Sequence, residues 1–580
     1  MTLSPQDVNK PQVPPRGNAL SREAWWRSWW PYLLVIGLWL VYAAVFIWKS
    51  SFIIDGVRYF ALFDDAMVSM TYARNLVHGD GLIWNAGGER VEGFSNPLWV
   101  GFMALVHLVP ISMPKISLVV QVASALLLAF LLPQVRVLAE TIVPGDRLAV
   151  WAAVVLTGFY YPLVNWSLLG TEVGLLTLIT CASVLLAVRA LDGAGFPKWL
   201  YPLLGAGTLV RIDGAIPMLA IMGMMFLFDA RHRWDHVRWG TLSLFVFLGG
   251  QTVLRWAYYG DWLPNTYYLK MTGYPVLLRM ARGRSVAWDF IRSLQVGLTL
   301  IPFLALMLHG DRKRWLLMGV VLAELAYSIY VGGDAWEHRG GANRFLATIT
   351  PLFMIVYMAG WHELRLLVAD TWTGLSGRLR LREPLRLSVL RGWEWAGTAG
   401  LVLVTAGSLL SFNLLKAGGR LREDLRDPDL GRLRFAALIE RSIFVPGTER
   451  YTKDALVIRE VTTPEARIAV VAAGNTPYFS ERYSIDLLGK SDRQIAHQPA
   501  RIPADRGHAI MFRPGHIKWD YAYSLGLLWP DVIVEPFRES YEEARPYLED
   551  YESITINGHP MYFRLGSPRV IWSTLAEYRQ

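Results

Sequence analysis

Cysteine and charged residues are scarce in this chain of 580 residues. It has a single cysteine, Cys181, which excludes an intrachain disulfide and a cysteine-based metal cage. Charged residues make up 18% of the chain and hydrophobic residues 53%, a balance too apolar for a soluble protein of several domains. The composition therefore indicates a polytopic membrane protein.

The sequence lacks motifs for a cleaved signal peptide, for a metal site and for a glycine-rich phosphate loop. Residues 1–30 lack a short apolar core followed by a small-residue cleavage site, so the apolar run 31–49 is expected to be an uncleaved first span. No HExxH or other metal-binding spacing surrounds His338. No glycine-rich loop between a strand and a helix lies near the candidate site residues named below. The predicted cofactor is none, and a divalent cation beside the carboxylates stays open as an alternative.

Apolar runs predict eleven transmembrane helices. Several are shorter than the roughly 20 residues that a spanning helix needs, so they should be tilted, extended or packed inside the bundle. The expected spans are 31–49, 117–136, 148–165, 171–189, 199–211, 214–230, 239–258, 297–309, 315–332, 347–367 and 396–415. The run 96–111 opens with "NPLW" and closes around Pro110, so we expect a re-entrant or surface-lying helix there.

The basic loops predict the orientation. The loops 231–238, 310–315 and 377–393 are rich in arginine and all fall on one side of the eleven-span arrangement. The positive-inside rule makes that side the cytoplasm, and it accounts for the net charge of +9 without nucleic acid. We therefore predict a multi-pass protein of the bacterial inner membrane with a cytoplasmic N-terminus.

The predicted domains follow from these spans. Residues 1–30 form a cytoplasmic tail, and residues 31–415 form the transmembrane domain, in which 50–116 is a first external loop with surface helices. Residues 416–580 contain charges, turns and β-branched runs bounded by Gly and Pro, which predict a soluble extracytoplasmic α/β domain.

Polar clusters of mixed chemistry gather on the predicted external face. The cytoplasmic loops are simple arginine runs, whereas the external clusters mix acids, bases, amides and aromatic residues, which suits a binding site. The candidate substrate-binding residues are Tyr72, Arg74, Asn75, Glu92, Asn96, Glu172, Arg211, Asp213, Asp261, Asn265, Tyr267, Lys270, Asp334, Arg339 and Arg344. Structural roles stay open for several: Glu172 can begin a helix, Arg211 and Asp213 can pair with each other, and Asp261 can belong to a turn.

Adjacent carboxylates, Asp64 and Asp65, open an amphipathic segment in the first external loop. The following apolar residues are spaced three or four apart, as in a short amphipathic helix that lies on a membrane surface. The glycines of "GDG" at 79–81 would end this helix. Because neighbouring side chains on a helix diverge by about 100°, the two carboxylates should differ in role. We expect one to cap the helix and the other to be the reactive group.

A family resemblance accompanies these residues. The segment "DDAMVSMTYARNLVHGDGLIWNAGGERVEGFSNPLW" (64–99) resembles the mycobacterial terminal β-(1→2)-arabinofuranosyltransferase family, whose members are GT-C glycosyltransferases. "YYGDWLPNTYYLK" (258–270), "GGD" (332–334) and "YFSERYSIDLLGKSD" (478–492) are similar to that group as well. The resemblance implies a GT-C fold and transfer of D-arabinofuranose from a polyprenyl phosphate, such as decaprenyl-phosphate arabinofuranose, to a cell-envelope glycan. It also implies that Asp64, the first residue of the pair, is the base.

The chemistry of such a donor is compatible with these residues. A phosphate-linked sugar carries its own leaving group, so the acceptor hydroxyl needs a base but the reaction needs no strong acid, and inversion is expected. The departing phosphate needs cations, for which Arg211, Lys270, Arg339 and Arg344 are available. The alternatives are transfer of another sugar, such as mannose, to protein or lipid, a lipid or glycan transporter, and a ligase of lipid-linked oligosaccharides.

Overall fold

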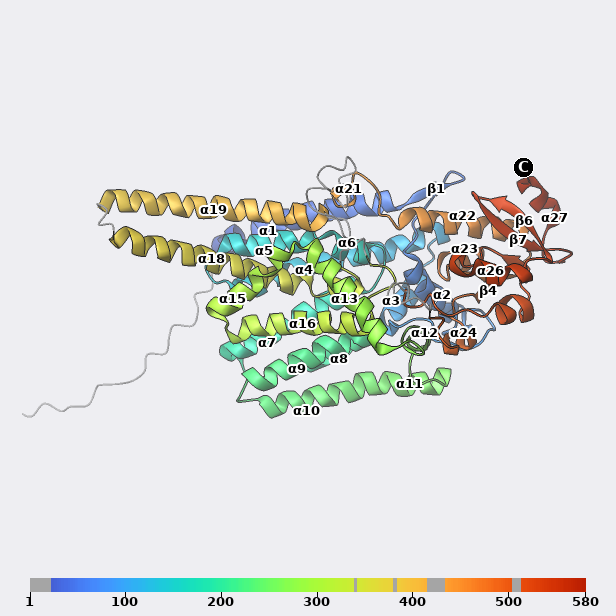
Figure 1. Ribbon diagram of the computed structural model, residues 1–580, viewed down its shortest axis with the longest axis horizontal. Coiled ribbons are helices and arrows are strands. Elements are labelled where there is room, and N and C mark those ends of the chain that lie inside the picture. Colours follow the sequence, from blue (N-terminus) through green and yellow to red (C-terminus); the bar gives the residue numbers. More distant parts are fainter. Residues whose placement is uncertain (1–21, 338–341, 379–382, 415–432, 503–512, 580) are drawn as a thin grey trace, which may run out of the picture.

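Long apolar helices run side by side along the longest axis of the molecule, and a small sheet domain covers one end of them (Figure 1). The structure is a computed structural model that describes residues 22–337, 342–378, 383–414, 433–502 and 513–579. The bundle helices are α1 (Arg22–Ser50), α4 (Met113–Ile142), α5 (Arg147–Gly158), α6 (Tyr161–Leu168), α7 (Val173–Arg189), α8 (Leu200–Val210), α9 (Ala215–Phe228), α10 (Arg233–Ser243), α11 (Gly250–Tyr259), α13 (Val276–Ser293), α14 (Val296–Thr299), α15 (Ile301–His309), α16 (Arg312–Val331), α18 (Thr350–Arg378) and α19 (Glu383–Leu414).

The described residues of each of the eleven apolar segments predicted as spans are largely helical. Among the described residues, six helices are long and apolar enough to cross a membrane, or up to eight if two bent helix pairs each count as one span. One bent pair is α5 and α6, which meet at 44° just before Pro162. The chain is thus a polytopic helical membrane protein, while the number of eleven spans stays a prediction.

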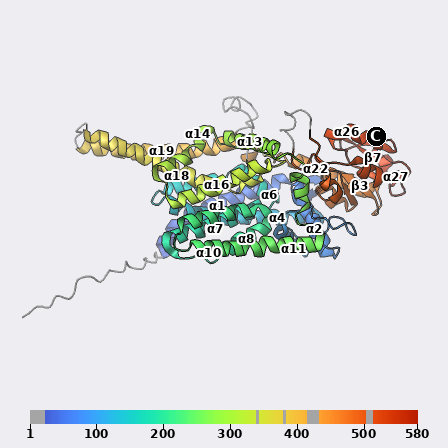
Figure 2. The ribbon, with the colours of Figure 1, turned by 60° about the horizontal axis from the view of Figure 1, so that its bottom comes forward.

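The short helices of the loops gather at the end of the bundle next to the sheet domain (Figures 1 and 2). They are α2 (Asp64–His78), α3 (Pro97–His107), α12 (Asn265–Met271) and α17 (Arg344–Ala347). The helix α3 has 11 residues, too few to span a membrane, as expected for 96–111. The hairpin of α18 and α19 projects from the opposite end, where the arginine-rich loops lie (Figure 1).

A five-stranded mixed sheet forms the core of the C-terminal part. Its strand order is β4-β3-β5-β7-β6, with β3 parallel to β4 and β5 and with β7 antiparallel to β5 and β6. The strands are β3 (Arg467–Val470), β4 (Tyr483–Asp486), β5 (Val532–Ile533), β6 (Tyr551–Ile556) and β7 (His559–Arg564). The helices around them are α21 (Leu433–Ala436), α22 (Val445–Val461), α23 (Asn475–Ser480), α24 (Arg493–His497), α26 (Tyr541–Ala544) and α27 (Trp572–Leu575).

The carboxyl ends of the parallel strands β3 and β4 point the following loops toward the bundle. The loop after β3 leads into α23, and the loop after β4 carries Lys490. In open α/β sheets this edge is where ligands bind, because the loops there bring polar backbone groups together. Here the same edge meets the start of α2.

The helix α2 corrects two expectations. It is buried over most of its length, between the bundle and the C-terminal part, rather than lying on a membrane surface. Neither aspartate caps it: Phe63 holds the N-cap position, and its side chain makes no capping hydrogen bond. Gly79 does end the helix in the left-handed conformation, with φ 92°, as the glycine pattern predicts.

Candidate active site

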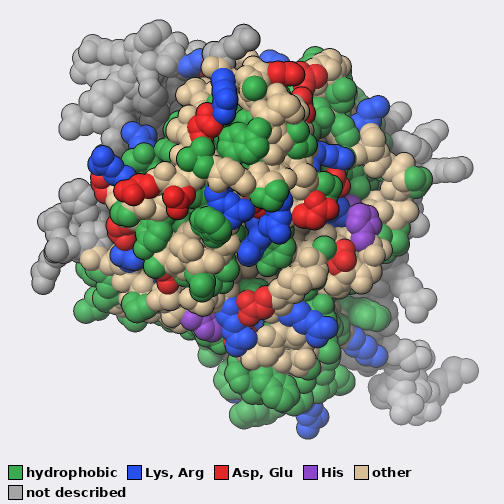
Figure 3. Space-filling view, turned by 90° about the vertical axis from the view of Figure 1, so that its right-hand side faces the viewer, with side chains coloured by type: hydrophobic (Ala, Val, Ile, Leu, Met, Phe, Trp, Pro, Cys, Tyr) green, Lys and Arg blue, Asp and Glu red, His purple; other side chains and the backbone are tan. Residues whose placement is uncertain are grey.

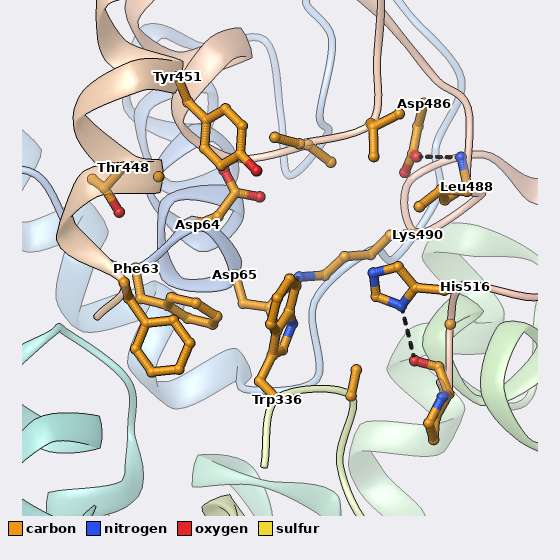
Figure 4. Close-up of a pocket in the computed structure, with 18 of the residues that line it drawn as sticks. Phe63, Asp64, Asp65, Trp336, Thr448, Tyr451, Asp486, Leu488, Lys490 and His516 are labelled. Atoms are coloured by element: carbon orange, nitrogen blue, oxygen red, sulfur yellow. Dashed lines mark hydrogen bonds and ion pairs between the residues drawn. The ribbon is translucent and has the colours of Figure 1, made fainter. Parts of the chain in front are cut away.

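The start of α2 opens into a cavity of about 260 Å³ between the bundle and the C-terminal part (Figure 4). Aromatic side chains form much of its wall, and both aspartates and two lysines lie in it. Its lining includes Phe63, Asp64, Asp65, Lys270, Trp336, Phe444, Tyr451, Lys490 and His516. These residues come from both parts of the chain, so the cavity exists only when the two parts are packed together.

Asp64 is held by the beginning of α23. Its Oδ1 accepts hydrogen bonds from the backbone N–H of Asn475 at 2.8 Å and of Gly474 at 3.2 Å. The Asn475 amide Nδ2 adds a longer bond at 3.3 Å. Burial raises the pKa of Asp64 to about 6, and the Asn475 hydrogen bonds oppose that shift. No described residue bonds its Oδ2, so one oxygen is held while the carboxyl group borders the cavity.

Asp65 lies among cations. Its Oδ1 accepts from Lys490 Nζ at 2.7 Å, and its Oδ2 accepts from Arg344 Nη1 at 2.8 Å. Arg344 also pairs with Asp334, with 2.7 Å between Nη2 and Oδ1. Although burial by itself would raise it, Lys490 and Arg344 hold the pKa of Asp65 well below its usual range. Asp65 is therefore a permanently charged partner of two cations.

Lys270 is a buried cation of the site. It makes no hydrogen bond or ion pair with any described residue, although it borders three adjoining cavities. Burial, together with the nearby charge of Arg344, lowers the pKa of its ammonium to about 8. A buried cation with unused N–H donors is suited to hold an anionic ligand.

A second cavity, of about 160 Å³, lies on the other side of Lys270. Arg211 borders it and donates from Nε and Nη2 to Asp213, at 2.9 and 2.7 Å, while Glu172 lies 3.6 Å from its Nε. The Nη1 of Arg211 is buried and has no hydrogen-bond partner among the described residues. The predicted pairing of Arg211 with Asp213 thus exists, and one donor of Arg211 remains unused.

Ten of the predicted site residues border these cavities, and six described ones do not. Those on the cavities are Asp64, Asp65, Asn96, Glu172, Arg211, Asp213, Tyr267, Lys270, Asp334 and Arg344. Those away from them are Tyr72, Arg74, Asn75, Glu92, Asp261 and Asn265. Arg339 and His338 lie outside the described residues.

Three of the residues away from the cavities belong to α2 and make contacts within the fold. Tyr72 donates to the carbonyl of Val91, and Asn75 donates to the carbonyls of Ile83 and Trp84. Arg74 donates to the Tyr478 carbonyl and so connects α2 to α23. These contacts fix the course of the first loop.

The other three, Glu92, Asp261 and Asn265, form contacts with α11 or with the C-terminal part. Glu92 forms a buried ion pair with Arg255 of α11. Asp261 pairs with Arg493 of α24 at 3.0 Å. Asn265 donates to three carbonyls of the segment 489–492. Their side chains therefore position elements around the site.

Sequence reasoning did not find several residues of the cavity. Asn475, Lys490, Trp336 and Tyr451 were not among the candidates. Lys490 had a signal, because it falls inside "YFSERYSIDLLGKSD", the segment that carries part of the family resemblance. Asn475 had a weaker one, since it follows the apolar run 467–474 directly, at the carboxyl end of a predicted strand.

A divalent cation beside the carboxylates stays a prediction, for which Asp64 Oδ2 is the carboxylate oxygen of the pair without a bond to a described residue. Both oxygens of Asp65 already accept from cations, and Asp64 Oδ1 accepts from three N–H groups. The described part of the chain contains no group of three or more His, Cys, Asp or Glu side chains placed to hold a metal ion.

Comparison with known proteins identifies the fold. Crystal structures of ArnT from Cupriavidus metallidurans superpose on this chain with TM-scores of 0.52 in the apo state and 0.53 when bound to undecaprenyl phosphate. Identity is 12% and 13%; the matches cover 92% and 93% of this chain and 97% and 98% of ArnT. This chain has the GT-C fold. The predicted GT-C-like helical membrane fold is thereby confirmed, while the eleven spans and the extracytoplasmic C-terminal domain stay predictions.

Two sequence matches complete the comparison. The chain is 26% identical over 361 residues to the terminal β-(1→2)-arabinofuranosyltransferase of Corynebacterium glutamicum, over 53% of this chain and 51% of that protein. It therefore spans about half the length of the curated relative it matches. A domain of unknown function (DUF8728) matches residues 445–567, which include the segments with Asn475 and Lys490.

Proposed function

We propose that this protein is a membrane glycosyltransferase that moves a sugar from a polyprenyl phosphate to an acceptor hydroxyl. The observation that carries the proposal is that one cavity is lined by the carboxylate of Asp64 and by Lys270, a cation with no hydrogen-bond or ion-pair partner among the described residues. A base for the hydroxyl and a cation for the departing phosphate are the two groups that this transfer requires.

Asp64 is the base in this proposal. As the acceptor oxygen bonds to the anomeric carbon, its proton passes to Asp64, and the bond from that carbon to the phosphate oxygen breaks with inversion. The hydrogen bonds from Asn475 hold the carboxylate in place, and a pKa of about 6 leaves it ionised yet more basic than an ordinary aspartate at neutral pH.

Lys270 receives the phosphate that leaves with the polyprenyl chain. Arg344 and Arg211 border the same second cavity and carry additional positive charge, although their main partners are Asp334 and Asp213. Asp65 holds Arg344 and Lys490 at the rim of the site and takes no proton, because its pKa is low. The two neighbouring carboxylates thus have separate roles.

The proposed donor sugar is D-arabinofuranose, and the proposed acceptor is a cell-envelope glycan. The matched relative is named a terminal β-(1→2)-arabinofuranosyltransferase, and one ArnT structure with the same fold holds undecaprenyl phosphate. The name of the relative supports the sugar, and the undecaprenyl phosphate of ArnT supports a lipid-linked donor. The aromatic wall of Phe63, Trp336 and Tyr451 is suited to a sugar ring.

The test is incubation of the purified full-length protein with polyprenyl phosphates that carry arabinofuranose or mannose, with and without a glycan acceptor. We expect transfer from the arabinofuranose donor, and slow donor hydrolysis when the acceptor is absent. Transfer from the mannose donor alone would reject arabinofuranose as the donor sugar but would support transfer from a polyprenyl phosphate. Turnover of a soluble nucleotide sugar in detergent without any lipid donor would reject the whole proposal.

We further propose that the site faces away from the cytoplasm, with residues 416–580 as an extracytoplasmic domain. The arginine-rich loops lie at the opposite end of the bundle, which supports this orientation (Figure 1). A cysteine at the exposed Glu89 should react with a membrane-impermeant maleimide on intact cells, and one at the exposed Arg231 only after permeabilisation. The native Cys181 is buried and should stay silent. The reverse pattern would reject the orientation.

A further inference from the structure

The helix that carries Lys270 is too short to be stable without contacts to the rest of the protein. The helix α12 has seven residues, Asn265–Met271, and isolated helices of this length are not stable in water. Lys270 lies in its last turn, where helices fray. The place of Lys270 therefore depends on what the ends of α12 contact.

A buried lysine of the C-terminal part holds the end of α12. Lys518 is fully buried, and its Nζ donates to the carbonyl of Tyr268 at 2.8 Å and to the hydroxyl of Thr272 at 3.1 Å. A third bond, also 2.8 Å, runs to the carbonyl of Ala496 at α24. Three acceptors require all three N–H groups of an ammonium, so Lys518 joins α12 to α24 as a cation.

Its location matches the electrostatics of the helix. The last carbonyls of a helix have no partner inside it and carry partial negative charge, which favours a cation there. No carboxylate among the described residues pairs with Lys518, so these carbonyls and the Thr272 hydroxyl are its observed partners. Burial lowers the pKa of Lys518 to about 8.

The other end of α12 is held by the same part of the chain. Asn265 Nδ2 donates to the carbonyls of Gly489, Lys490 and Asp492, at 2.9, 3.0 and 3.1 Å. Between the two ends, the ring of Tyr268 packs on that of His497, with centroids 4.2 Å apart. The C-terminal part thus fixes α12 along its whole length and carries Lys490 in the same contact.

We propose that Lys518 is a positioning residue for donor binding: it fixes the last turn of α12 so that the Lys270 ammonium stays between the two cavities. This inference rests on the proposed function, in which Lys270 binds the donor phosphate. Without Lys518, Lys270 remains present but is held less well, so donor binding weakens while the chemistry at Asp64 is retained.

The test compares donor KM and kcat in full-length variants. Lys518→Met keeps the aliphatic stem and removes the three N–H donors, and we expect donor KM to rise about tenfold with kcat within about twofold. Thr272→Val keeps the shape but removes a hydroxyl that accepts from Lys518 and donates to the Tyr268 carbonyl at 2.6 Å, and it should raise donor KM about threefold. Thr272→Ser keeps the hydroxyl and should behave as the native protein. A pH titration would not separate the lysines, because Lys270 and Lys518 both have a pKa lowered to about 8.

A matched control removes a different contact between the same two parts. Asn85 exchanges two hydrogen bonds with the backbone of Ser484, at 2.8 and 2.9 Å, and does not touch α12. Asn85→Ala should lower Tm without changing donor KM. An equal rise of donor KM in Asn85→Ala and Lys518→Met would overturn the positioning role and leave a general effect of loosened packing.

Lys270→Met separates this inference from the proposed function. If that variant leaves donor KM unchanged, the phosphate role of Lys270 is wrong. If it raises donor KM strongly while Lys518→Met does not, only the positioning role is wrong. Should Lys518→Met fail to fold, the pair Thr272→Val and Thr272→Ser decides, and equal donor KM in those two would overturn the proposal.

Discussion

The adjacent residues Asp64 and Asp65 lie in different environments on two sides of the cavity of about 260 Å³. On one side, Asp64 faces backbone N–H groups of α23 and aromatic walls, and burial raises its pKa to about 6. On the other, Asp65 faces Lys490 and Arg344, which keep its pKa well below the usual range. Environment alone gives two identical residues different properties: a carboxyl with a raised pKa, which is the base of the proposed reaction, and an anion paired with two cations.

The C-terminal part supplies both environments. The loop after β3 provides Asn475 for Asp64, and the loop after β4 provides Lys490 for Asp65. These loops leave the carboxyl ends of neighbouring parallel strands, so one sheet edge sets the properties of both carboxylates. The face of the C-terminal part that points away from the bundle carries a mixture of acidic and basic side chains (Figure 3).

The largest expected effect is that of Asp64→Asn. The amide keeps the size of the side chain and can still accept from Asn475, but it is not a base. We expect kcat to fall by about 10²-fold or more, with Tm close to that of the native protein. Near-native turnover in a folded variant would remove Asp64 from the reaction.

Asp65→Asn should show the opposite pattern. It leaves Lys490 and Arg344 without their shared carboxylate, and losing hydrogen bonds to charged groups should lower the free energy of unfolding by about 2 kcal/mol. Thermal unfolding followed by tryptophan fluorescence measures this, and kcat should fall less than in Asp64→Asn. A variant with native Tm and no turnover would exchange the roles of the two residues.

Much of the site could be predicted because charge next to a membrane is informative. Asp64, Lys270 and Arg344 belong to polar clusters that stand out from apolar spans, and the loop charges place those clusters at one end. The GT-C fold was likewise implied by the family resemblance of the 64–99 segment.

The partners of each residue could not be predicted, because they come from distant parts of the chain. Asn475 lies 411 residues after Asp64, and Lys490 lies 425 residues after Asp65. Helix capping, a local rule, assigned one aspartate to a cap, but the ion pairs of Asp65 prevailed over it. Likewise, the buried partner of Glu92 is Arg255, 163 residues later in the chain.

The pH dependence of kcat should report Asp64. The base must be ionised, so kcat should rise with pH, reach half its maximum at a pH of about 6 and level off at higher pH. Well below that midpoint, each pH unit lowers the ionised fraction about tenfold. Lys490 lowers the pKa of Asp64 through its charge, so Lys490→Met should move the acid limb to higher pH. A midpoint near that of an ordinary aspartate, unmoved in Lys490→Met, would contradict the raised pKa.

The smallest expected effect is that of Asn475→Ala, which separates the backbone from the side chain at Asp64. The backbone N–H bond of 2.8 Å remains; Nδ2 loses its 3.3 Å bond to Asp64 and a 3.4 Å bond to the carbonyl of Leu62. One weak hydrogen bond corresponds to about a threefold fall in kcat, and the acid limb should move to higher pH because that bond lowers the pKa of Asp64. Thr476→Ala is the matched control, since Thr476 contacts the carbonyl of Tyr451 and not Asp64. If both variants lose kcat equally with an unmoved acid limb, α23 supports the fold of the cavity without tuning the base.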